Sequence, residues 1–259
     1  MRCKCVNFNI QIMPKSVVTL ATVISMRPSG KNNSCVTFLT QSEGIVHATL
    51  YGGPKSKMKS LVSPWNTGTA YFSISNNENY KISDFDAKIY RLSFRENLLK
   101  FWAASLAAEI AIKTKCSGNA AKCWALINGF LDGLELCSTD EQCIAGLIRF
   151  LWRYLALMGI QPEAENCCRC GKKITDGAVF NAAENGFCCR SCAQKPSGFE
   201  IPQNGIEYLN AISELSPKEA RNAVLFKESV SSVKQILYYL TENACGTELT
   251  SFKTSAGIL

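Results

Sequence analysis

Histidine is nearly absent from this sequence of 259 residues, in which His47 is the only one. A single histidine argues against hydrolases that use a histidine base, and it excludes metal enzymes that need several imidazole ligands. Residues 1–84 also lack a D-x-D cluster of the kind that holds a catalytic metal, which argues against a nuclease. We therefore expect a protein that is not an enzyme and that acts by binding.

Long apolar runs are missing as well. Glu109 interrupts the stretch 101–112, and two arginines interrupt the stretch 144–158, so neither reaches the ~18 residues that a membrane-spanning helix needs. The first residues contain no apolar segment typical of a signal peptide. We expect a cytoplasmic protein without membrane contact, in which residues 1–14 are an extension of the first domain.

Negative charge is scarce in the first third of the chain. Residues 1–84 contain nine Lys and Arg residues but only three acidic residues, which accounts for +6 of the net charge of +7. A localised positive field concentrates phosphate groups, so this distribution favours a polyanionic partner such as nucleic acid. Lysines scattered over a solvated surface are the alternative explanation.

Short segments rich in Val, Ile, Thr, Tyr and Phe fill the same third, and clusters of Gly, Pro, Asn and Ser separate them. Five strands within ~75 residues are typical of a small barrel of the OB type, which leaves little exposed edge. We expect His47 to be an ordinary side chain of this barrel, because no second histidine can join it as a ligand. The expected strands are Val17–Ile24, Cys35–Thr40, Ile45–Tyr51, Thr69–Ser75 and Ala87–Leu92.

After about residue 94 the apolar residues repeat every three or four positions, which indicates helices. Ser216-Pro217-Lys218-Glu219 has the residues of a helix start, and Gly246 is a suitable helix end. The expected helices cover Ala120–Leu136, Glu141–Met158, a segment that begins at Ser216, and roughly Val230–Asn243.

The predicted fold class is therefore α+β. An OB-fold DNA-binding domain covers residues 1–84, and a helical bundle domain covers residues 85–259. A zinc-ribbon insert at residues 166–194 interrupts the helices, and the helices on either side of it are expected to pack as one bundle.

The strongest chemical signal lies among the 14 cysteines, which without secretion are expected to be reduced thiols or metal ligands. Two C-x₂-C hooks, separated by 18 residues, have the spacing of a zinc site, and four thiolates suit one structural Zn²⁺. Cys168 and Cys188, which are next to hook cysteines, are not expected to be metal ligands. An iron–sulfur cluster or a redox pair of cysteines is the alternative to zinc. The expected ligands are Cys167, Cys170, Cys189 and Cys192.

A basic loop, Tyr51-Gly52-Gly53-Pro54-Lys55-Ser56-Lys57-Met58-Lys59, follows the third expected strand. Two glycines allow close approach of the backbone, and three alternate lysines would line one extended edge, as single-stranded nucleic acid requires. A solvated hairpin tip is the alternative. Nearby aromatic residues are Phe38, Trp65, Tyr71 and Phe72, of which at least half are expected in the barrel core. The expected DNA contacts are Arg27, Lys31, Lys55, Lys57 and Lys59.

In their order and spacing these features resemble the RecO family of bacterial DNA repair proteins. The resemblance covers most of the chain beyond about Val17, although Asn185-Gly186 stands where that family usually has paired glycines. The matching stretches are Phe38-Leu39-Thr40 with Gly44, Gly52-Gly53-Pro54-Lys55-Ser56-Lys57 leading to Leu61 and Pro64, Leu155–Pro162, both cysteine hooks with Phe180, and Tyr238-Tyr239-Leu240.

The resemblance implies a nucleoid-associated mediator of homologous recombination in the RecF pathway. Such a protein binds single- and double-stranded DNA and anneals complementary strands. Its implied partners are RecR, the C-terminal tail of single-stranded-DNA-binding protein and, indirectly, RecA. A zinc-ribbon adaptor that binds only proteins, without direct DNA contact, is the alternative.

Overall fold

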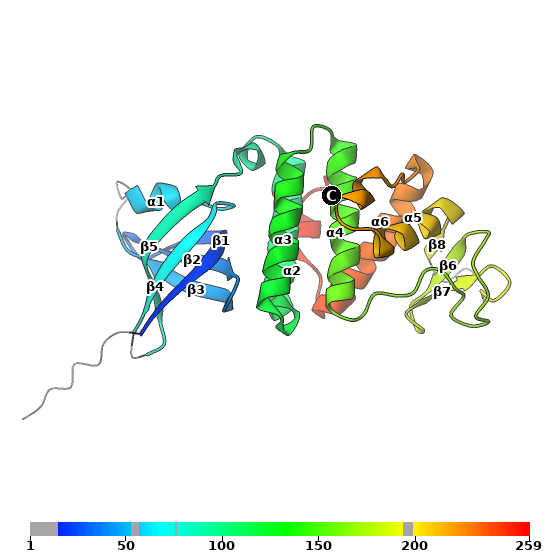
Figure 1. The fold of residues 1–259 in the computed structure, drawn as a ribbon, viewed down its shortest axis with the longest axis horizontal. Helices are drawn as coiled ribbons and strands as arrows, with labels where there is room; N and C mark the ends of the chain where they lie inside the picture. The colour runs from blue at the N-terminus through cyan, green and yellow to red at the C-terminus, as the bar shows by residue number, and fades with distance from the viewer. Residues whose placement is uncertain (1–14, 53–56, 76, 194–198) are drawn as a thin grey trace, which may run out of the picture. The chain divides into compact units, whose positions relative to one another are not determined.

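The computed structural model of the chain describes residues 15–52, 57–75, 77–193 and 199–259, which form two compact units (Figure 1). The first unit comprises Val46–Ile89 with the described residues up to Phe38, and the second comprises Leu39–Ile45 with Tyr90–Leu259. The first unit is a sheet and the second is mostly helical, so the chain is of mixed α+β class. Residues 1–14, expected to be an extension, lie outside the described residues. No described helix is both long enough and apolar enough to cross a lipid bilayer.

The first unit is built from five strands: β1 (Lys15–Ser29), β2 (Asn33–Thr40), β3 (Gly44–Leu50), β4 (Thr67–Ile74) and β5 (Tyr80–Ile89). They close into a barrel in the order β1-β2-β3-β5-β4, in which β1 pairs antiparallel with β4, and β3 runs parallel to β5. Alternate side chains of the strands point inward and fill the barrel. Phe38 lies at the centre, with its ring 5.2 Å from that of Phe72 and 5.8 Å from that of Phe85.

The fifth strand corrects the sequence prediction. The sequence predicts it over Ala87–Leu92, but β5 begins at Tyr80 and ends at Ile89. Acidic and lysine side chains occupy its exposed positions and lower its apparent β propensity, whereas Ile82 and Phe85 face the barrel core. The barrel therefore extends to residue 89 instead of ending at residue 84.

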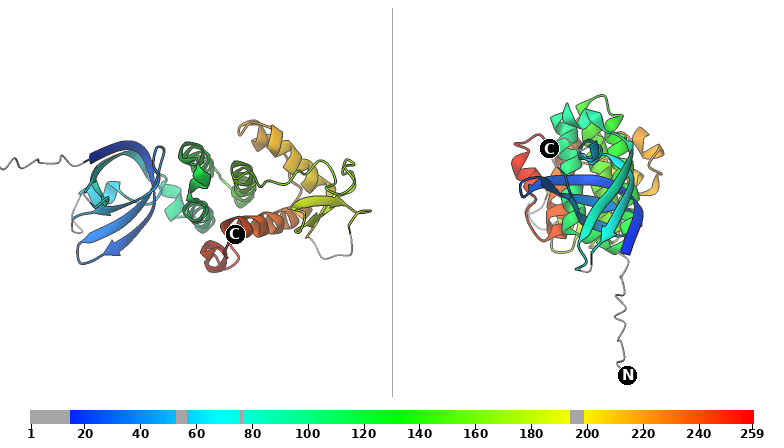
Figure 2. Two further views of the ribbon diagram at one scale, coloured as in Figure 1. Left: turned by 90° about the horizontal axis from the view of Figure 1, so that it is seen from below. Right: turned by 90° about the vertical axis from the view of Figure 1, so that its left-hand side faces the viewer.

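The second unit contains these helices: η1 (Leu92–Arg95), α2 (Leu98–Lys113), η2 (Lys115–Gly118), α3 (Ala120–Glu135), α4 (Asp140–Leu157), α5 (Gln203–Glu214), η3 (Glu219–Asn222), α6 (Lys227–Cys245) and α7 (Thr250–Thr254). α4 packs against α2, α3, α5 and α6, which surround it (Figure 2). The side chains of Asn97, Asn119 and Thr139 accept backbone N–H groups and cap α2, α3 and α4.

The predicted helices Ala120–Leu136, Glu141–Met158 and Val230–Asn243 correspond to α3, α4 and α6, and Gly246 ends α6 with a φ of 66°. The helix expected from Ser216 is only the single turn η3. The capping box itself is present, because Ser216 Oγ accepts the Glu219 N–H at 3.3 Å and Glu219 Oε2 accepts the Ser216 N–H at 3.1 Å. The residues that follow η3 are exposed, among them Val224 and Phe226, so there is no apolar face to bury that would prolong the helix.

The chain passes from α2 to α3 through η2, whose backbone is left-handed. Lys115, Cys116, Ser117 and Gly118 have φ values of 48°, 56°, 52° and 71°. Left-handed backbone is unfavourable for residues that carry a Cβ atom. The buried Cys116 side chain anchors this turn in the helical core.

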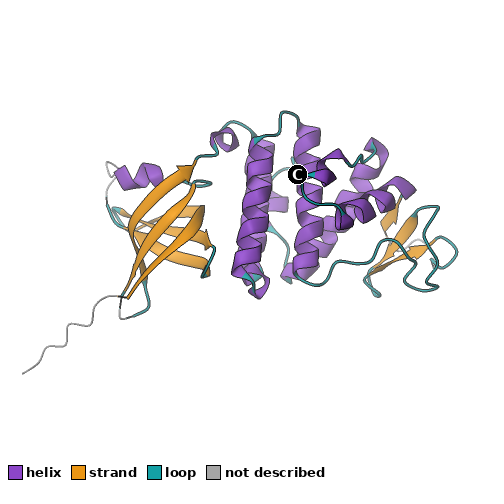
Figure 3. Cartoon of the chain, in the orientation of Figure 1, coloured by secondary structure: helices purple, strands orange, loops and turns teal. Residues whose placement is uncertain are grey.

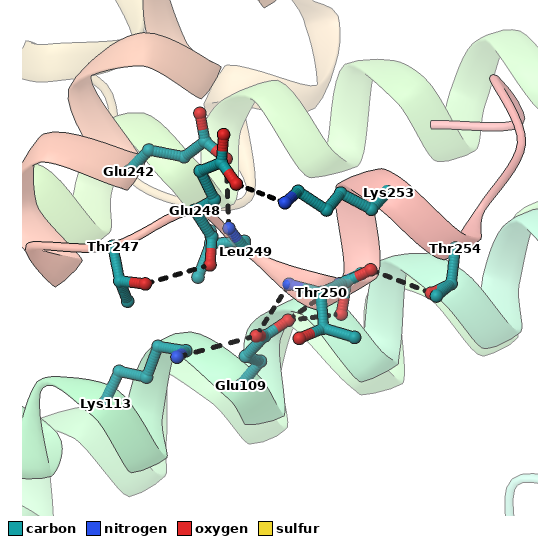
Figure 4. A network of polar contacts seen from close by, with 10 residues as sticks. Glu109, Lys113, Glu242, Thr247, Glu248, Leu249, Thr250, Lys253 and Thr254 are labelled. Carbon is teal, nitrogen blue, oxygen red and sulfur yellow. Dashed lines mark hydrogen bonds and ion pairs between the residues drawn. The ribbon is translucent and has the colours of Figure 1, made fainter.

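The C-terminal helix α7 is attached to α2 by one carboxylate (Figure 4). Glu109 Oε1 accepts the backbone N–H of Thr250, and Oε2 accepts both the N–H and the hydroxyl of Ser251, all at 2.8 Å. Lys113 is 4.0 Å from the same carboxylate. Burial alone would raise the pKa of Glu109, but the hydrogen bonds from Ser251 and Thr250 outweigh burial and lower it.

Replacing Glu109 with Gln tests this attachment and predicts a pH dependence. A carboxylate whose pKa is lowered by folding stabilises the fold above its ordinary pKa of about 4.3, and this stabilisation disappears as the pH falls through the folded-state value. We expect E109Q to reduce the free energy of unfolding by about 1 kcal/mol at pH 7 and by much less near pH 3, measured by urea unfolding. Glu214→Gln, at an exposed position of α5, is the control. An equal loss at both pH values would show that the charge is not responsible.

Candidate functional site

Along the chain, both cysteine hooks and a three-stranded sheet lie between α4 and α5. The sheet packs at one end of the helices (Figure 3). β6 (Ala178–Asn181) pairs antiparallel with β7 (Gly186–Cys189) on one side and with β8 (Phe199–Ile201) on the other. Phe180 and Phe187 are buried with ring centroids 5.4 Å apart, and Phe180 also contacts Tyr239 of α6. We call this segment, residues 163–193 and 199–202, the cysteine ribbon.

The four cysteines predicted to bind metal come together in the ribbon. The Sγ atoms of Cys167, Cys170, Cys189 and Cys192 all lie within 4.8 Å of one another, and those of Cys170 and Cys189 are 3.9 Å apart. Zn²⁺ bound to four thiolates at 2.3 Å places its ligands about 3.8 Å apart, so this donor set and spacing fit the ion. Each hook is a tight turn: the Gly171 N–H donates to the Cys167 carbonyl at 2.9 Å, and the Cys192 N–H donates to that of Cys189 at 3.0 Å.

The backbone of the hooks also favours thiolates. Burial would raise the pKa of Cys167, but hydrogen bonds from backbone groups of Cys170, Cys189 and Arg169 outweigh burial and bring the pKa to about 6. The Cys192 thiol instead donates hydrogen bonds to the sulfurs of Cys170 and Cys189, which raises its pKa to about 12. A metal ion bound by the four sulfurs would displace such thiol protons.

Cys168 and Cys188 form a separate pair on the same ribbon. Their Sγ atoms are 2.9 Å apart, and Cys168 Sγ lies 3.3 Å from Glu184 Oε2. Arg169 pairs with the other oxygen of Glu184 at 2.9 Å. Burial and the contacts with Cys188 and Glu184 raise the pKa of Cys168. The structure thus keeps both extra cysteines out of the four-cysteine cluster, and nothing in their sequence spacing had indicated that they meet.

The residues predicted to contact DNA lie at two places on the first unit. Arg27 and Lys31 are exposed at the β1–β2 turn, and Lys57 is exposed on the short helix α1 (Lys57–Leu61). Lys55 lies outside the described residues. The loop lysines were expected to line one extended edge, and this expectation is wrong. Met58 and Leu61 pack on the barrel core as part of a helical turn, in which Lys57 and Lys59 point about 200° apart.

Two exposed residues beside this loop were not predicted as contacts. Tyr51 is 54% exposed at the end of β3, and Lys81 of β5 lies over its ring, 5.7 Å from the centroid. The alternation along β3, in which Ala48 and Leu50 face inward, places Tyr51 on the outside and could have identified it. Of the aromatic residues considered from the sequence, Phe38, Phe72 and Trp65 are buried and Tyr71 is exposed.

His47 and two aspartates of the first unit are the remaining titratable groups to consider for a catalytic role. His47 is exposed on β3 with Nδ1 3.1 Å from Thr37 Oγ1. Because the barrel extends past residue 84, it includes Asp84-Phe85-Asp86, a D-x-D sequence. Asp84 accepts the Phe85 N–H at 2.8 Å and Asp86 pairs with Lys88 at 3.4 Å. Among the described residues neither aspartate belongs to a group of three potential metal ligands.

A groove of about 520 Å³ lies between α3 and α4 in the second unit. Phe130 and Phe150, stacked with ring centroids 4.4 Å apart, form part of its lining. Gly129 and Gly133 leave open space on α3, since a Cβ at either position would contact nothing within 4 Å. The groove is therefore apolar and wide enough for a side chain of another molecule.

Three arginines border this groove: Arg149, Arg153 and Arg221. The described residues that line it include no carboxylate. Burial, and to a smaller extent the neighbouring guanidinium of Arg149, lower the pKa of Arg153. An apolar groove with this border is complementary to a segment that combines a large apolar side chain with carboxylates.

The chain is similar to known DNA repair proteins over most of its length. The DNA repair protein RecO of Oceanobacillus iheyensis is 23% identical over 220 residues, which cover 83% of each chain. The protein of the same name from Syntrophus aciditrophicus is 24% identical over 233 residues, covering 84% of this chain and 86% of its own. The DNA repair protein RecO of Bacillus pumilus is 28% identical over 206 residues, covering 76% of this chain and 71% of its own.

The profile of the family described as "Recombination protein O C terminal" matches residues 95–251. This match spans more than half of the chain and includes helices α2 to α6, the cysteine ribbon and the arginine-bordered groove. The chain therefore belongs to the RecO family of DNA repair proteins.

Proposed function

We propose that this protein mediates homologous recombination by binding single- and double-stranded DNA, annealing complementary strands and helping to load a recombinase on coated single strands. The observation that carries the proposal is membership in the RecO family, together with a five-stranded barrel that exposes basic residues. We take the barrel to be an OB-type DNA-binding domain. No step of this function requires bond chemistry, so we propose that the protein is not an enzyme.

The proposed DNA contacts are of two kinds. Arg27, Lys31, Lys57 and Lys59, with Lys55, would neutralise phosphates and supply most of the affinity. Tyr51 offers an exposed ring on which a base can stack, and Lys81 beside it adds positive charge. The later part of β5 contributes less, because Asp84 and Asp86 outnumber its single lysine, Lys88.

Annealing follows from these contacts by a simple electrostatic argument. Two complementary strands repel each other through their phosphates, and lysines that neutralise one strand lower this repulsion. Contacts through a ring face hold a base without occupying its pairing edge. The bound strand can therefore pair with an incoming strand while it is still held by the protein.

We propose that Cys167, Cys170, Cys189 and Cys192 bind one zinc ion with a structural role. The support is the closeness of the four sulfurs and the lowered pKa of Cys167. Four protein ligands leave no coordination position for substrate, so the ion would only hold the two hooks together.

We propose that the arginine-bordered groove receives the C-terminal tail of single-stranded-DNA-binding protein. A chain terminus carries a carboxylate, which the arginines can neutralise, and the space over Gly129 and Gly133 accepts an apolar side chain. Association with RecR, and through these partners with RecA, is proposed from family membership, as is a location at the nucleoid.

Exchange of the three loop lysines, Lys55, Lys57 and Lys59, for Glu tests DNA binding. If all three contact phosphates, the logarithmic salt slope for single-strand binding should fall by about 2, from about 0.7 per phosphate, measured by fluorescence anisotropy. A triple variant of exposed helical-unit lysines with the same charge change (Lys122, Lys218 and Lys227 to Glu) is the control. Equal salt slopes in both variants would show that the loop does not contact DNA. If the parent protein does not bind DNA at all, the alternative of an adaptor that binds only proteins is favoured.

Replacement of Cys170 by Ser tests the metal centre. We expect about one zinc ion per chain in the parent protein, and loss of most of it in the variant, measured by elemental analysis. The ribbon of the variant should also become sensitive to proteases, because structural zinc contributes folding free energy. Cys245→Ser, in α6, is the control and should retain its zinc. Protein purified without chelators that contains no metal would refute the site.

Replacement of Gly129 by Leu tests the groove by filling it. We expect the dissociation constant for a labelled peptide with the tail sequence to rise about 10-fold or more, which corresponds to 1.4 kcal/mol. Arg149→Glu should also weaken binding of the same peptide, and this effect should be smaller in high salt, which screens charges. The control is Ala121→Leu, at an exposed position of α3 that does not line the groove. Unchanged peptide binding in both groove variants would exclude this location.

A further inference from the structure

The pair Cys168 and Cys188 is too close to be a second metal site of the same kind. Thiolates that share a tetrahedral zinc lie about 3.8 Å apart, and Cys170 and Cys189 agree with this spacing at 3.9 Å. The sulfurs of Cys168 and Cys188 are only 2.9 Å apart. A disulfide has a sulfur–sulfur bond of about 2.05 Å, so this pair needs only a small further approach to bond.

The backbone of the ribbon holds the two cysteines in place. The Cys168 N–H donates to the carbonyl of Phe187 at 2.8 Å, and the side chain of Phe187 is completely buried. Gly186 permits the close approach, because a Cβ there would lie 2.7 Å from the Cβ of Cys168. This backbone contact therefore brings Cys168 next to β7, within reach of the Cys188 side chain.

One of the two sulfurs is accessible to small molecules. Cys168 is exposed, whereas Cys188 is buried. Cys168 lines a hollow of about 430 Å³, together with Glu163, Asn166, Asn185 and the proposed ligand Cys167. A small polar oxidant can therefore reach Cys168, and the sulfur that lies nearest to the oxidised atom is that of Cys188.

We propose that Cys168 and Cys188 form a reversible disulfide when the protein meets a hydroperoxide. In the first step the Cys168 sulfur attacks the terminal peroxide oxygen: an S–O bond forms, the O–O bond breaks, and water or an alcohol leaves. In the second step the Cys188 sulfur attacks Cys168: the S–S bond forms, the S–O bond breaks, and water leaves. Two thiols together lose two electrons and two protons, and the peroxide is reduced.

The disulfide would join the same two hooks as the proposed zinc ion. Cys168 directly follows the ligand Cys167, and Cys188 directly precedes the ligand Cys189. Oxidation of this pair uses no metal ligand, so it can clamp the ribbon with the ion still bound. The clamped ribbon should lose zinc to a chelator more slowly than the reduced one.

The test uses the full-length, metal-loaded protein and hydrogen peroxide. We expect tandem mass spectrometry of non-reduced peptides to find a Cys168–Cys188 link. The linked species should be lighter by the mass of two hydrogens, and dithiothreitol should restore this mass. Zinc content measured on the same sample should not change. Cys168→Ser should abolish the link and leave the zinc content intact, which also shows that the variant is folded. Cys35→Ser, a half-exposed thiol of the first unit, is the control and should still form the link.

Three results would overturn the proposal. In the first, peroxide links the ligand cysteines and releases zinc in proportion. In the second, it leaves Cys168 and Cys188 unlinked. In the third, Cys168→Ser lowers the metal content and so identifies a second ion. None of these depends on whether the parent protein binds DNA or peptide. Failure of the redox pair is therefore distinguishable from failure of the proposed function.

Discussion

The second unit depends on the burial of α4. This helix is covered on almost every side and buries Phe150, Leu151, Trp152 and Tyr154. Replacement of a buried Phe or Trp by Ala typically costs about 3–5 kcal/mol. Trp152 has no exposed surface and donates its Nε1 hydrogen to Ser213 Oγ at 2.8 Å, which joins α4 to α5. The helices on either side of the ribbon in sequence therefore share one core.

The candidate sites of this unit are arranged around the same helix. α4 supplies Arg149 and Arg153 to the border of the groove, while its C-terminal end leads into the ribbon. There the Gln161 side chain donates to the Trp152 carbonyl at 2.8 Å, and that of Asn185 donates to the Ile160 carbonyl at 3.1 Å. These contacts, the buried rings of Phe180 and Phe187 and the sulfur atoms together determine the shape of the ribbon.

Local pattern was sufficient to predict part of this structure. The apolar periodicity of α3 and α4 and the spacing of the two hooks are properties of neighbouring residues, so the sequence alone indicated them. β5 was misplaced because its exposed aspartates and lysines hide a strand whose buried residues are Ile82 and Phe85. The pairing of Cys168 with Cys188 results from the packing of the first hook against β7, and the groove arises where α3 and α4 meet. Neither can be obtained without the tertiary structure.

The left-handed turn η2 has a consequence for the order of folding. Three of its four residues carry a Cβ atom, at a cost of about 1–2 kcal/mol each, so the isolated α2–η2–α3 segment gains little from adopting it. The turn is held partly from within the segment, because the buried Cys116 interacts with Cys123 of α3. Beside the turn, Thr114 Oγ1 lies 2.6 Å from the hydroxyl of Tyr154 of α4, which is 3.7 Å from Cys123 Sγ. Part of the compensation for the strain therefore depends on α4, and we expect the link between α2 and α3 to reach its native shape only when α4 docks.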